Sequence, residues 1–510
     1  MDIRNHTFAE LTGRKNGNFS LQDIMTFVRD NEIRMINFMY PAADGRLKTL
    51  NFVIDTEEYL HSVLTCGERV DGSSLFPFIE AGNSDLYVIP RLSTAFIDPF
   101  EELPTLCFLC AYFDKDGNRL EYSPEYTLSK AKKIFREKTG MDFEAMGELE
   151  YYVSAPEEGD LEMYPATDQK GYHESAPFAK FNSFRTRCMY YIMLAGGKIK
   201  YGHSEVGNFR AGGKVWEQNE IEFLPVDIEK AADSIMLAKW IIRNLAYEYG
   251  LEVSFAPKIA EGKAGSGLHI HMRLMKDGKN MLLDGNGKIS GTARRAIAGL
   301  MELAPSLTAF GNANPTSYLR LVPHQEAPTN VCWGDRNRSV LVRIPLGWTT
   351  DKDMFAEING STSGASSGAG STAGTAPGRA SVKQTMEIRS ADCSADIYQL
   401  LSALSIACAY GLSLDNALET AERTYVDVDI HKAENEAKAA VLAHLPDSCA
   451  ASADRLEEQR GIYEADGIFH PAMTESIIRR LRSFDDTGLR KKLKDNPEYE
   501  ADLVRKFYWC

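Results

Sequence analysis

The chain lacks both an excess of basic residues and any long hydrophobic segment. Its 510 residues carry a formal net charge of −15, with 72 acidic against 57 basic side chains. General nucleic-acid binding requires a basic surface, so this balance argues against nucleic acid as a partner. No uncharged apolar run approaches the roughly 18 residues that a membrane-spanning helix needs. We therefore expect no nucleic acid and no membrane among its partners, whereas anionic substrates stay compatible because local charge governs their binding.

Cysteine is also scarce, with nine residues scattered along the chain. Cys107 and Cys110 form the only CxxC motif and have no second pair nearby, so we interpret them as core thiols rather than as a metal or redox site. The N-terminal sequence MDIRNHTFAE is polar and of mixed charge, and it lacks the apolar centre of a signal peptide. These features predict a cytoplasmic protein with reduced cysteines.

The length of the chain exceeds that of one compact core, which predicts two or more domains. We interpret residues 1–20 as a polar N-terminal extension and residues 21–122 as a small sheet-rich domain. Within that domain, two β-rich runs flank a turn at Asp44 and Gly45 and predict a β-hairpin. The segments LYVIP and TLCFLCAYF predict further strands.

The remaining residues, 123–510, mix helical and strand-like segments in one larger domain. Ser123 is typical of a helix start, and Gly140 of the end of the same helix. A second amphipathic helix begins near Asp227, and the pattern is mostly helical from Ala391 on. Because helices and strands do not alternate as regular βαβ units, the sequence predicts an α+β fold.

One segment of this larger domain has an unusual composition. Residues 360–376 read GSTSGASSGAGSTAGTA. Such a stretch cannot bury enough apolar surface to order itself. We therefore expect a flexible surface insertion at about residues 358–382.

Three pairs of polar residues share an i, i+2 spacing. They are Glu148 with Glu150, His269 with His271, and Glu387 with Arg389. On a β-strand, residues at this spacing point to the same face. Each pair therefore projects two polar groups to one side of a sheet, while apolar neighbours pack on the other. Carboxylates together with histidine suit Mg²⁺ or Mn²⁺.

An isolated pair of this kind is usually a solvated strand face. Here Glu205 and Glu220 add two carboxylates, and a glycine-rich turn, GKAGSG, precedes the histidines. Such turns let the backbone approach a ligand closely. The combination indicates a site for divalent metal.

A basic cluster lies in the segment RLVPHQEAPTNVCWGDRNRSVLVRIP. It contains Arg320, Arg336, Arg338 and Arg343, with Glu326 between them. Arginine binds carboxylate and phosphate with two parallel hydrogen bonds. The alternative interpretation of any one of these arginines is a surface residue paired with the protein's own carboxylates.

Taken together, the motifs resemble the glutamine synthetase family, in its bacterial type I form. The matching segments appear in family order over roughly residues 20–490: VDGSSL, STAFIDPF, GELEYY, KGY, HSEV, EQNEI, GSGLHIH, RLVP, EAP, RNRS, RIP, EIR and LPDS. Each is weak alone, and together they are specific. The resemblance implies a small β-grasp-like domain at residues 21–122 and a catalytic domain at residues 123–510 built on a curved antiparallel sheet.

The resemblance also implies roles for individual residues. The metal ligands would be Glu148, Glu150, Glu205, Glu220, His269 and Glu387. Glutamate would be held by Arg320, Arg389 and Gly265, and ATP by His271, Arg338 and Arg343. The ammonium pocket would contain Asp71, Ser74, Tyr172 and Glu326, with Asp71, Glu326 and Arg338 acting in catalysis.

The reaction that the resemblance implies is the ATP-dependent ligation of ammonia to the γ-carboxylate of glutamate. A carboxylate is a poor electrophile, so it must first be activated as γ-glutamyl phosphate. Two or more Mg²⁺ or Mn²⁺ ions and several arginines would offset the repulsion between anionic substrates. Asp71 would deprotonate ammonium, and Glu326 would help bind this cation and shield the acyl phosphate from water.

In this family the N-terminal domain of one subunit completes the active site of its neighbour. The resemblance therefore implies a homo-oligomer with inter-subunit active sites, expected as a dodecamer of two stacked hexameric rings. The sequence contains no segment that resembles the family's adenylylation loop.

Several positions depart from the type I pattern. Thr385 stands where the family usually has arginine, and Arg379, Lys383 or Arg273 could supply the missing cation. Ala264 replaces an asparagine of the glutamate loop. His324 and Gln325 stand where the family has Gly-Tyr, and seven additional residues separate Glu205 from Glu220.

These departures leave two alternatives to the ammonia ligase. One is a γ-glutamyl-amine ligase of the same family that uses a polyamine, ethanolamine or another amine. The other is a non-catalytic structural or regulatory member, which would be expected to lose its metal ligands. All six candidate ligands are present in this sequence.

Overall fold

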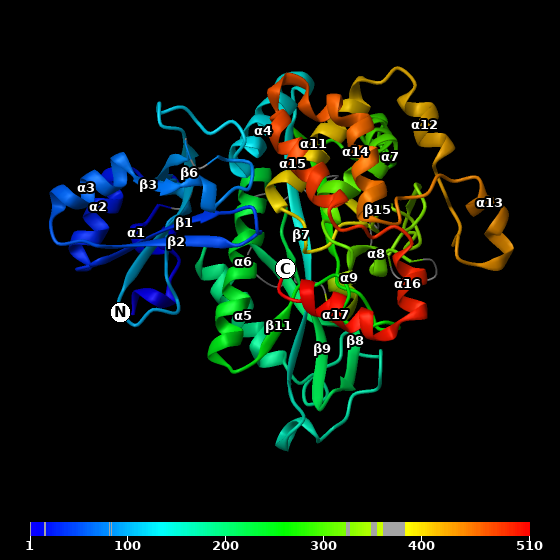
Figure 1. Ribbon diagram of the computed structural model, residues 1–510, viewed down its shortest axis with the longest axis horizontal. Helices are drawn as coiled ribbons and strands as arrows, with labels where there is room; N and C mark the ends of the chain where they lie inside the picture. Colours follow the sequence, from blue (N-terminus) through cyan, green and yellow to red (C-terminus); the bar gives the residue numbers. More distant parts are fainter. Residues whose placement is uncertain are drawn as a thin grey trace.

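The computed structural model describes residues 2–14, 17–80, 82, 84–322, 327–347, 354–360 and 383–510. Within these residues the strands form two sheets, a six-stranded sheet near the N-terminus and a ten-stranded sheet in the larger part of the chain. Figure 1 shows the smaller sheet at one side of the molecule and the larger sheet beneath a helical layer. The fold is α+β, as predicted.

The smaller sheet begins with the predicted hairpin. Strands β1 (Met35–Pro41) and β2 (Leu47–Val53) pair antiparallel, and β1 also pairs parallel with β6 (Thr105–Phe113). Strands β4 (Asp85–Pro90) and β3 (Glu68–Asp71) complete the order β2-β1-β6-β4-β3, with β5 (Phe96–Ile97) beside β6. The predicted strand TLCFLCAYF coincides with β6.

Helices α2 (Leu21–Asp30) and α3 (Glu57–Cys66) contribute to the core of this sheet, and α1 (Phe8–Thr12) precedes them. Phe8 is only 2% exposed. Its ring packs edge-on against Phe19 and Phe27, with centroids 4.8 Å apart in each pair. The segment interpreted from sequence as a polar extension therefore contributes an anchor to the core, because one aromatic side chain outweighs its polar surroundings.

The larger sheet has the strand order β14-β15-β16-β12-β7-β9-β8. Its long strands are β7 (Asp142–Pro156), β8 (Ile199–Ala211), β9 (Lys214–Phe223) and β12 (Leu268–Lys276). Its shorter strands are β10 (Val226–Asp227), β11 (Glu252–Ser254), β13 (Lys279–Asn280), β14 (Trp333–Asp335), β15 (Val342–Ile344) and β16 (Met386–Ile388). The central neighbours β16, β12, β7 and β9 are all antiparallel, which lets residues from distant segments face each other directly.

One face of this sheet is apolar and buried. Leu149, Ile221 and Ile270, from three adjacent strands, are each fully buried in the main core. Helices α4 (Pro124–Thr139), α5 (Asn182–Leu194) and α6 (Ile228–Glu248) contribute to the same core. Since side chains alternate across a strand, the residues between these apolar ones are presented on the opposite face.

The two helices predicted at Ser123 and Asp227 are confirmed. Helix α4 has Ser123 as its N-cap and ends at Gly140, whose φ of +66° is readily adopted by glycine. Helix α6 has Asp227 as its N-cap, and the Asp227 side chain accepts a hydrogen bond from the amide of Glu229. Both helices therefore begin at the capping residue that the sequence indicated.

The C-terminal part of the chain is helical, as predicted. Helix α9 (Met354–Asn359) ends just inside the predicted insertion at about residues 358–382. Residues 361–382 are not among the described residues, so most of this insertion lies outside them. The remaining helices are α7 (Gly291–Gly311), α8 (Ser317–Arg320), α11 (Ile397–Ser413), α12 (Ala417–Arg423), α13 (Glu436–Ala440), α14 (Cys449–Glu464), α15 (Pro471–Arg482), α16 (Leu489–Asp495) and α17 (Pro497–Phe507). None of the described helices alone is long and apolar enough to cross a membrane; only α11 and α12, as a pair bent by 111°, satisfy the requirements of length and composition.

A partly buried ion pair connects the N-terminal domain to the larger one. The two terminal nitrogens of Arg91 lie 2.7 and 2.9 Å from the carboxylate oxygens of Asp233 on α6. The hydroxyl of Tyr398 on α11 donates a hydrogen bond of 2.8 Å to the same carboxylate. The junction thus connects the small domain to helices α6 and α11. Cys107 and Cys110 are buried free thiols within β6, as predicted.

Candidate metal centre and substrate cavity

The face of the larger sheet opposite its apolar core carries a band of acidic and histidine side chains. The antiparallel registers place His269 of β12 opposite Glu148 of β7, and His271 opposite Glu387 of β16. Further across the sheet, Glu150 lies opposite Glu220 of β9, which in turn lies opposite His203 of β8. The i, i+2 spacing in the sequence thus becomes one contiguous polar surface.

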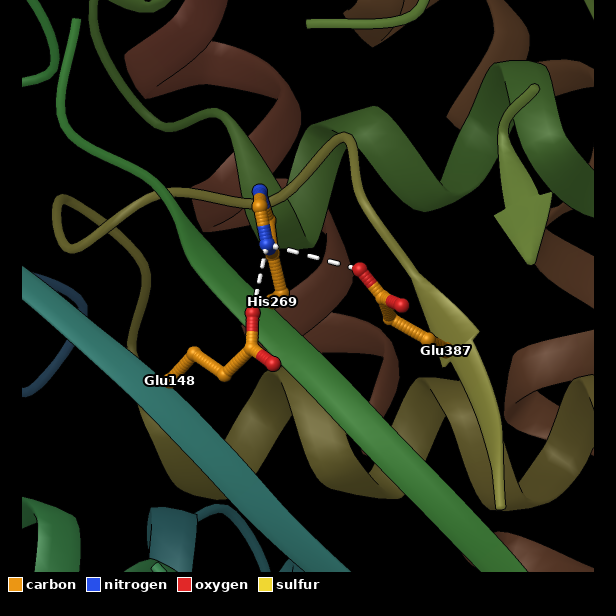
Figure 2. A group of neighbouring side chains, drawn as sticks. All are labelled: Glu148, His269 and Glu387. Carbon is orange, nitrogen blue, oxygen red and sulfur yellow. Dashed lines mark hydrogen bonds and ion pairs between the residues drawn. The ribbon is translucent and has the colours of Figure 1, made fainter. Parts of the chain in front are cut away.

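The first cluster consists of Glu148, His269 and Glu387, and Figure 2 shows the two carboxylates converging on the imidazole. His269 Nδ1 lies 2.8 Å from Glu148 Oε2 and 3.5 Å from Glu387 Oε1. One nitrogen and two oxygens at this separation form a donor set that fits a divalent cation. The structure brings these three predicted ligands together.

Arginines hold the Glu387 carboxylate, which is fully buried. Arg343 Nε lies 3.3 Å from one of its oxygens, and Arg389 Nε donates a hydrogen bond of 3.1 Å to the other. Arg389 also donates to the backbone carbonyl of Arg338, whose side chain is exposed. The predicted phosphate and glutamate residues therefore surround a predicted metal ligand.

His271 extends the first cluster towards Thr385. Its Nε2 lies 2.8 Å from Glu148 Oε1, and its Nδ1 lies 2.8 Å from the Thr385 hydroxyl. Thr385 thus makes a specific contact at the position where arginine was expected. Arg273, proposed as a substitute cation, forms an ion pair with Glu144. Arg379, proposed for the same role, lies outside the described residues.

A second cluster is formed by His203, Glu205 and Glu220. His203 Nε2 lies 3.4 Å from Glu220, and its Nδ1 lies 3.7 Å from Glu205. Glu150 stands between the clusters, since its Oε1 lies 4.0 Å from His269 Nε2. Its other oxygen accepts hydrogen bonds from the Gly267 amide at 2.7 Å and from Gln218 at 3.1 Å.

The electrostatics of this band favour a cation. Burial raises the pKa of Glu220 well above its usual range, and the negative charges of Glu148 and Glu150 raise it further. Burial alone would also raise the pKa of Glu148, but the charge of His271 and hydrogen bonds from both histidines outweigh it and hold that pKa well below its usual range. Like charges crowded together in a buried site repel one another, and a divalent cation would relieve this repulsion.

A cavity of about 260 Å³ opens beside the two clusters. Its lining includes Glu150, His269, Arg320 and the loop residues Ala264 and Gly265. Arg320 is buried, and its guanidinium donates to the backbone carbonyls of Ser390, Ala391 and Arg389. Predicted glutamate-binding and metal-binding residues thus share one cavity.

Glycine is required where the loop meets Arg320. A Cβ on Gly265 would lie 2.8 Å from Arg320 Cγ, and a Cβ on Gly267 would lie 2.4 Å from Arg320 Nη2. The loop is otherwise held through its backbone: the Ala264 amide donates to Gln169, and its carbonyl accepts from Tyr152. These bonds account for how the loop keeps its position without the expected asparagine side chain.

The described residues of the predicted ammonium pocket lie in two places, with Asp71 and Ser74 at the end of β3 and Tyr172 against His203 of β8. Asp71 is exposed at the end of β3, and its carboxylate accepts hydrogen bonds from the hydroxyls of Ser73 and Ser74 at 2.8 and 2.7 Å. Hydrogen bonds from Ser74 and nearby serines lower the pKa of Asp71. Tyr172 is half exposed and stacks on His173, 4.2 Å between centroids. In Figure 1, β3 lies on the side of α6 away from β8 and β9.

Sequence reasoning missed two members of the clusters. His203 belongs to the second cluster, and Glu222 forms a further group with Glu148 and His271. Both stand at the same i, i+2 spacing, in HSE and EIE, that identified the other pairs. Glu326 was predicted as a site residue from the sequence, but it lies outside the described residues, together with His324 and Gln325.

Family models match two regions of the chain. The glutamine synthetase β-grasp domain matches residues 32–115, and the glutamine synthetase catalytic domain matches residues 121–360. Among proteins of known function, the glutamine synthetase of Mycobacterium tuberculosis is 30% identical over 508 residues, which cover 92% of this chain and 96% of the relative. That of Frankia alni is 29% identical, with the same coverage.

Solved structures show the same fold at lower identity. The glutamine synthetase of Plasmodium falciparum superposes with a TM-score of 0.72 at 17% identity, and apo GmaS with a TM-score of 0.71 at 18% identity. Each comparison covers 92% of this chain and 97% of the other. The chain therefore belongs to the glutamine synthetase family and is an ATP-dependent ligase.

Proposed function

We propose that the protein is a glutamine synthetase that ligates ammonia to the γ-carboxylate of L-glutamate, with ATP as co-substrate and γ-glutamyl phosphate as intermediate. One observation supports this most directly. Residues from β7, β8, β9, β12 and β16 meet as two clusters of carboxylates and histidine beside a cavity lined by Arg320 and Gly265. A site for cations next to a site for a carboxylate substrate is what the activation of glutamate by ATP requires.

The clusters would hold two divalent ions, Mg²⁺ or Mn²⁺. Glu148, His269 and Glu387 fit one ion, and Glu205 and Glu220, with His203 near by and Glu150 between the clusters, fit the other. Bound there, the ions would neutralise phosphate charge during phosphoryl transfer. His271, Arg338 and Arg343 would lie near the phosphates of ATP.

Glutamate would occupy the cavity beside the clusters. Arg320 would bind its α-carboxylate with charge-assisted hydrogen bonds, and the Gly265 backbone would approach its amino group. Arg389 would keep Glu387 in place and contribute positive charge near the reacting γ-carboxylate. The cavity volume of about 260 Å³ is close to the lower end of small-ligand sites, which begins at roughly 300 Å³, and so suits a substrate of this size.

Ammonium would bind at a pocket completed by a neighbouring subunit. Asp71 and Ser74 are exposed on the N-terminal domain, where their side chains bond to each other and to Ser73. Asp71 would act as the base across the interface, with Tyr172 and Glu326 on the receiving side. This requires a homo-oligomer, which we propose to be a dodecamer of two stacked hexameric rings in the cytoplasm.

A larger amine is the second candidate acceptor. GmaS, a γ-glutamylmethylamide synthetase, shares the fold, and His324 and Gln325 replace a Gly-Tyr pair beside Glu326 in this sequence. Asp71, Ser74 and Tyr172, by contrast, all match the pattern of the ammonia enzymes. This retention favours ammonia.

The deciding experiment measures glutamate-dependent phosphate release from ATP with ammonium, methylamine, ethanolamine and putrescine as acceptors. Ammonia should give the highest kcat/KM. A higher value for any of the amines would replace the proposal by the amine ligase. Absence of phosphate release with every acceptor, in protein shown to be folded and supplied with Mg²⁺ or Mn²⁺, would contradict both.

A further inference from the structure

Gln218 is a buried glutamine of β9 that lies between the candidate metal centre and the loop at residues 264–267, here called the glutamate loop. Its exposed fraction is 1%. It stands opposite Tyr152 of β7, and the family resemblance gives it no role. Because a buried side-chain amide is almost always hydrogen-bonded, its partners indicate what this residue does.

The side-chain nitrogen of Gln218 joins a predicted metal ligand to the glutamate loop. It lies 3.1 Å from Glu150 Oε2, 3.0 Å from the carbonyl oxygen of Gly265 and 3.2 Å from the hydroxyl oxygen of Ser266. An amide nitrogen carries two hydrogens, so the three acceptors share them. A movement of Glu150 or of the loop therefore changes the hydrogen bonds that are left for the other.

The bond from Gln218 also orients the carboxylate of Glu150. Oε2 of this carboxylate accepts from Gln218 and, at 2.7 Å, from the amide of Gly267. The other oxygen, Oε1, lies 4.0 Å from His269 Nε2. Two donors occupy the lone pairs of Oε2, so a cation would bind Glu150 through Oε1.

The side-chain carbonyl of Gln218 completes a bulge in the neighbouring strand. The register of β8 and β9 shifts between Ser204 and Asn208, so that residues 205–207 stand opposite Gln218 alone. Gln218 Oε1 accepts a hydrogen bond of 3.1 Å from the amide of Gly207. Bulges interrupt the ladder of backbone hydrogen bonds and re-aim side chains, and here a side chain supplies the acceptor for a backbone amide of the bulge.

The bulge begins with Glu205, a predicted metal ligand, and ends tightly packed. A Cβ on Gly207 would lie 2.0 Å from the hydroxyl oxygen of Tyr152 and 2.7 Å from Gln218 Oε1. The Tyr152 hydroxyl in turn donates to the carbonyl of Ala264 in the glutamate loop, at 2.8 Å. The segment that presents Glu205 and the glutamate loop are thus held by the same two side chains.

We propose that Gln218 is a positioning residue that makes binding of a divalent cation at the second cluster and binding of glutamate cooperative. A cation that binds Glu150 and Glu205 fixes the groups at both ends of the Gln218 amide. The amide then holds the Gly265 carbonyl in place, so the loop is already ordered when glutamate arrives, and the second ligand binds at a lower entropic cost. That glutamate is the ligand of this loop rests on the proposed function.

A purely structural role makes a different prediction. If Gln218 only completes the pairing of β8 with β9, its replacement lowers the stability of the fold and leaves the coupling between the two ligands as it was. Coupling is reciprocal, so the effect of glutamate on metal affinity equals the effect of metal on glutamate affinity. Metal affinity is therefore a sufficient readout, and it does not depend on catalysis.

The experiment measures the dissociation constants of Mn²⁺ for the full-length oligomer, with and without saturating L-glutamate, by the paramagnetic resonance signal of unbound Mn²⁺. Gln218→Met keeps an unbranched side chain of similar size and removes both ends of the bridge. Gln218→Asn keeps a neutral amide that is one methylene too short to span it. Gln459→Met is the matched control, because Gln459 donates to a backbone carbonyl, that of Glu302, in the helical layer.

Glutamate should tighten Mn²⁺ binding in wild type by about fivefold or more, the lower end of typical couplings between sites. Gln218→Met and Gln218→Asn should each lower this factor about threefold or more, and Gln459→Met should leave it unchanged. Chelation of unbound Mn²⁺ by glutamate is the same in every sample and cancels from the comparison.

Two results would overturn the inference: a coupling factor in both Gln218 variants equal to that of wild type, or Mn²⁺ binding in wild type that does not respond to glutamate. A uniform weakening of Mn²⁺ binding, equal with and without glutamate, belongs to the first of these. Failure of the proposed function has a separate signature, since wild type would then bind no Mn²⁺ at all. Gln218→Asn keeps the buried position polar, so it carries the test if Gln218→Met does not fold.

Discussion

His271 Nδ1 lies 2.8 Å from the hydroxyl oxygen of Thr385, while the other ring nitrogen of His271 lies 2.8 Å from Glu148. The imidazole is thus held between a threonine and a predicted metal ligand. A hydrogen bond at the second ring nitrogen fixes the orientation and tautomer of a functional histidine. Thr385, which stands where the family usually has arginine, therefore helps to orient His271 in this chain.

Replacing Thr385 with valine removes that hydrogen bond at nearly constant volume. We expect Thr385→Val to lower kcat/KM for ATP by about tenfold, because a buried polar contact of this kind is worth roughly 1 to 1.5 kcal/mol. Thr385→Ser keeps the hydroxyl and should retain activity to within about twofold. Steady-state kinetics with varied ATP measures both. Equal losses in the two variants would contradict the prediction, because serine keeps the hydroxyl that valine lacks.

Because the carboxylates are crowded, we expect Glu220→Gln to have opposite effects on thermal stability in the absence and in the presence of metal. Glu220→Gln removes one of several mutually repelling charges, so the variant should unfold at the same or a higher temperature than wild type in EDTA. Added Mn²⁺ should raise the unfolding temperature of wild type, since a ligand at about 100 times its Kd adds about 2.7 kcal/mol of stability. The increment should shrink in Glu220→Gln.

Differential scanning fluorimetry across a Mn²⁺ titration tests this expectation. The exposed Glu419 on α12 provides the control, because Glu419→Gln changes the same charge away from the clusters. Equal Mn²⁺ increments in wild type, Glu220→Gln and Glu419→Gln would argue against a metal at the second cluster.

Sharing of active sites between subunits predicts complementation. Asp71→Asn and Glu220→Gln should each abolish most activity when expressed alone. In co-expressed hybrid oligomers, a site that takes its metal ligands from one variant and Asp71 from the other is intact. Random mixing makes such sites about a quarter of the total. Recovery of activity near that level in purified hybrids supports the shared site, whereas hybrids as inactive as either parent would mean that each chain uses its own Asp71.

The environment of Asp396 predicts a pH-dependent stability. Burial raises the pKa of Asp396 from 3.8 to about 6, against the opposing effects of the Gln399 hydrogen bond and the charge of Arg480. A carboxyl group whose pKa is raised in the folded state stabilises the fold while it is protonated. This contribution is complete below about pH 4 and is lost as the pH rises through about 6.

Asp396→Asn keeps a side-chain oxygen for the helix cap and cannot ionise. The stability of the variant relative to wild type should therefore increase between about pH 4 and pH 7, by at most about 3 kcal/mol for a shift of about two pKa units. Urea unfolding at a series of pH values measures the difference. Asp415→Asn, at an exposed position after α11, should show no such trend. A constant offset between Asp396→Asn and wild type across this range would contradict the raised pKa.

Local signals in the sequence predicted individual elements well. The helix that starts at Ser123 is marked by a proline in its first turn and by the terminal Gly140, and both features act within a few residues. The strand β6 coincides with a continuous apolar run, and the β1–β2 hairpin with an Asp-Gly turn. Such elements are determined by interactions that are close in sequence, so a single chain suffices to find them.

Pairing between distant strands could not be predicted in the same way. Nothing local indicates that β1 pairs in parallel with β6, or that β16 lies next to β12, more than 100 residues earlier in the chain. The i, i+2 spacing predicted that each polar pair shares a face, but the meeting of Glu148, His269 and Glu387 depends on strand order. The expectation that they converge came from the family resemblance.

Two residues that the sequence analysis did not single out show a further limit of prediction from local patterns. His203 and Glu222 carry the same spacing signal as the residues that were found, and their place in the clusters follows from the registers of β8 and β9. Phe8 is a related case: a single aromatic residue in a polar segment enters the core. A single apolar residue does not produce a periodic pattern that sequence analysis can detect. Its burial can nevertheless determine where the segment packs.

The ion pair between Arg91 and Asp233 has a genetic consequence. It orients a domain that, under the proposed function, serves a catalytic centre in another polypeptide. A substitution at Arg91 would then leave the metal ligands of its own chain unaltered and impair the adjoining subunit. In a cell that expresses both alleles, such a variant would behave as dominant, because the active sites of normal subunits assembled next to it would lose activity.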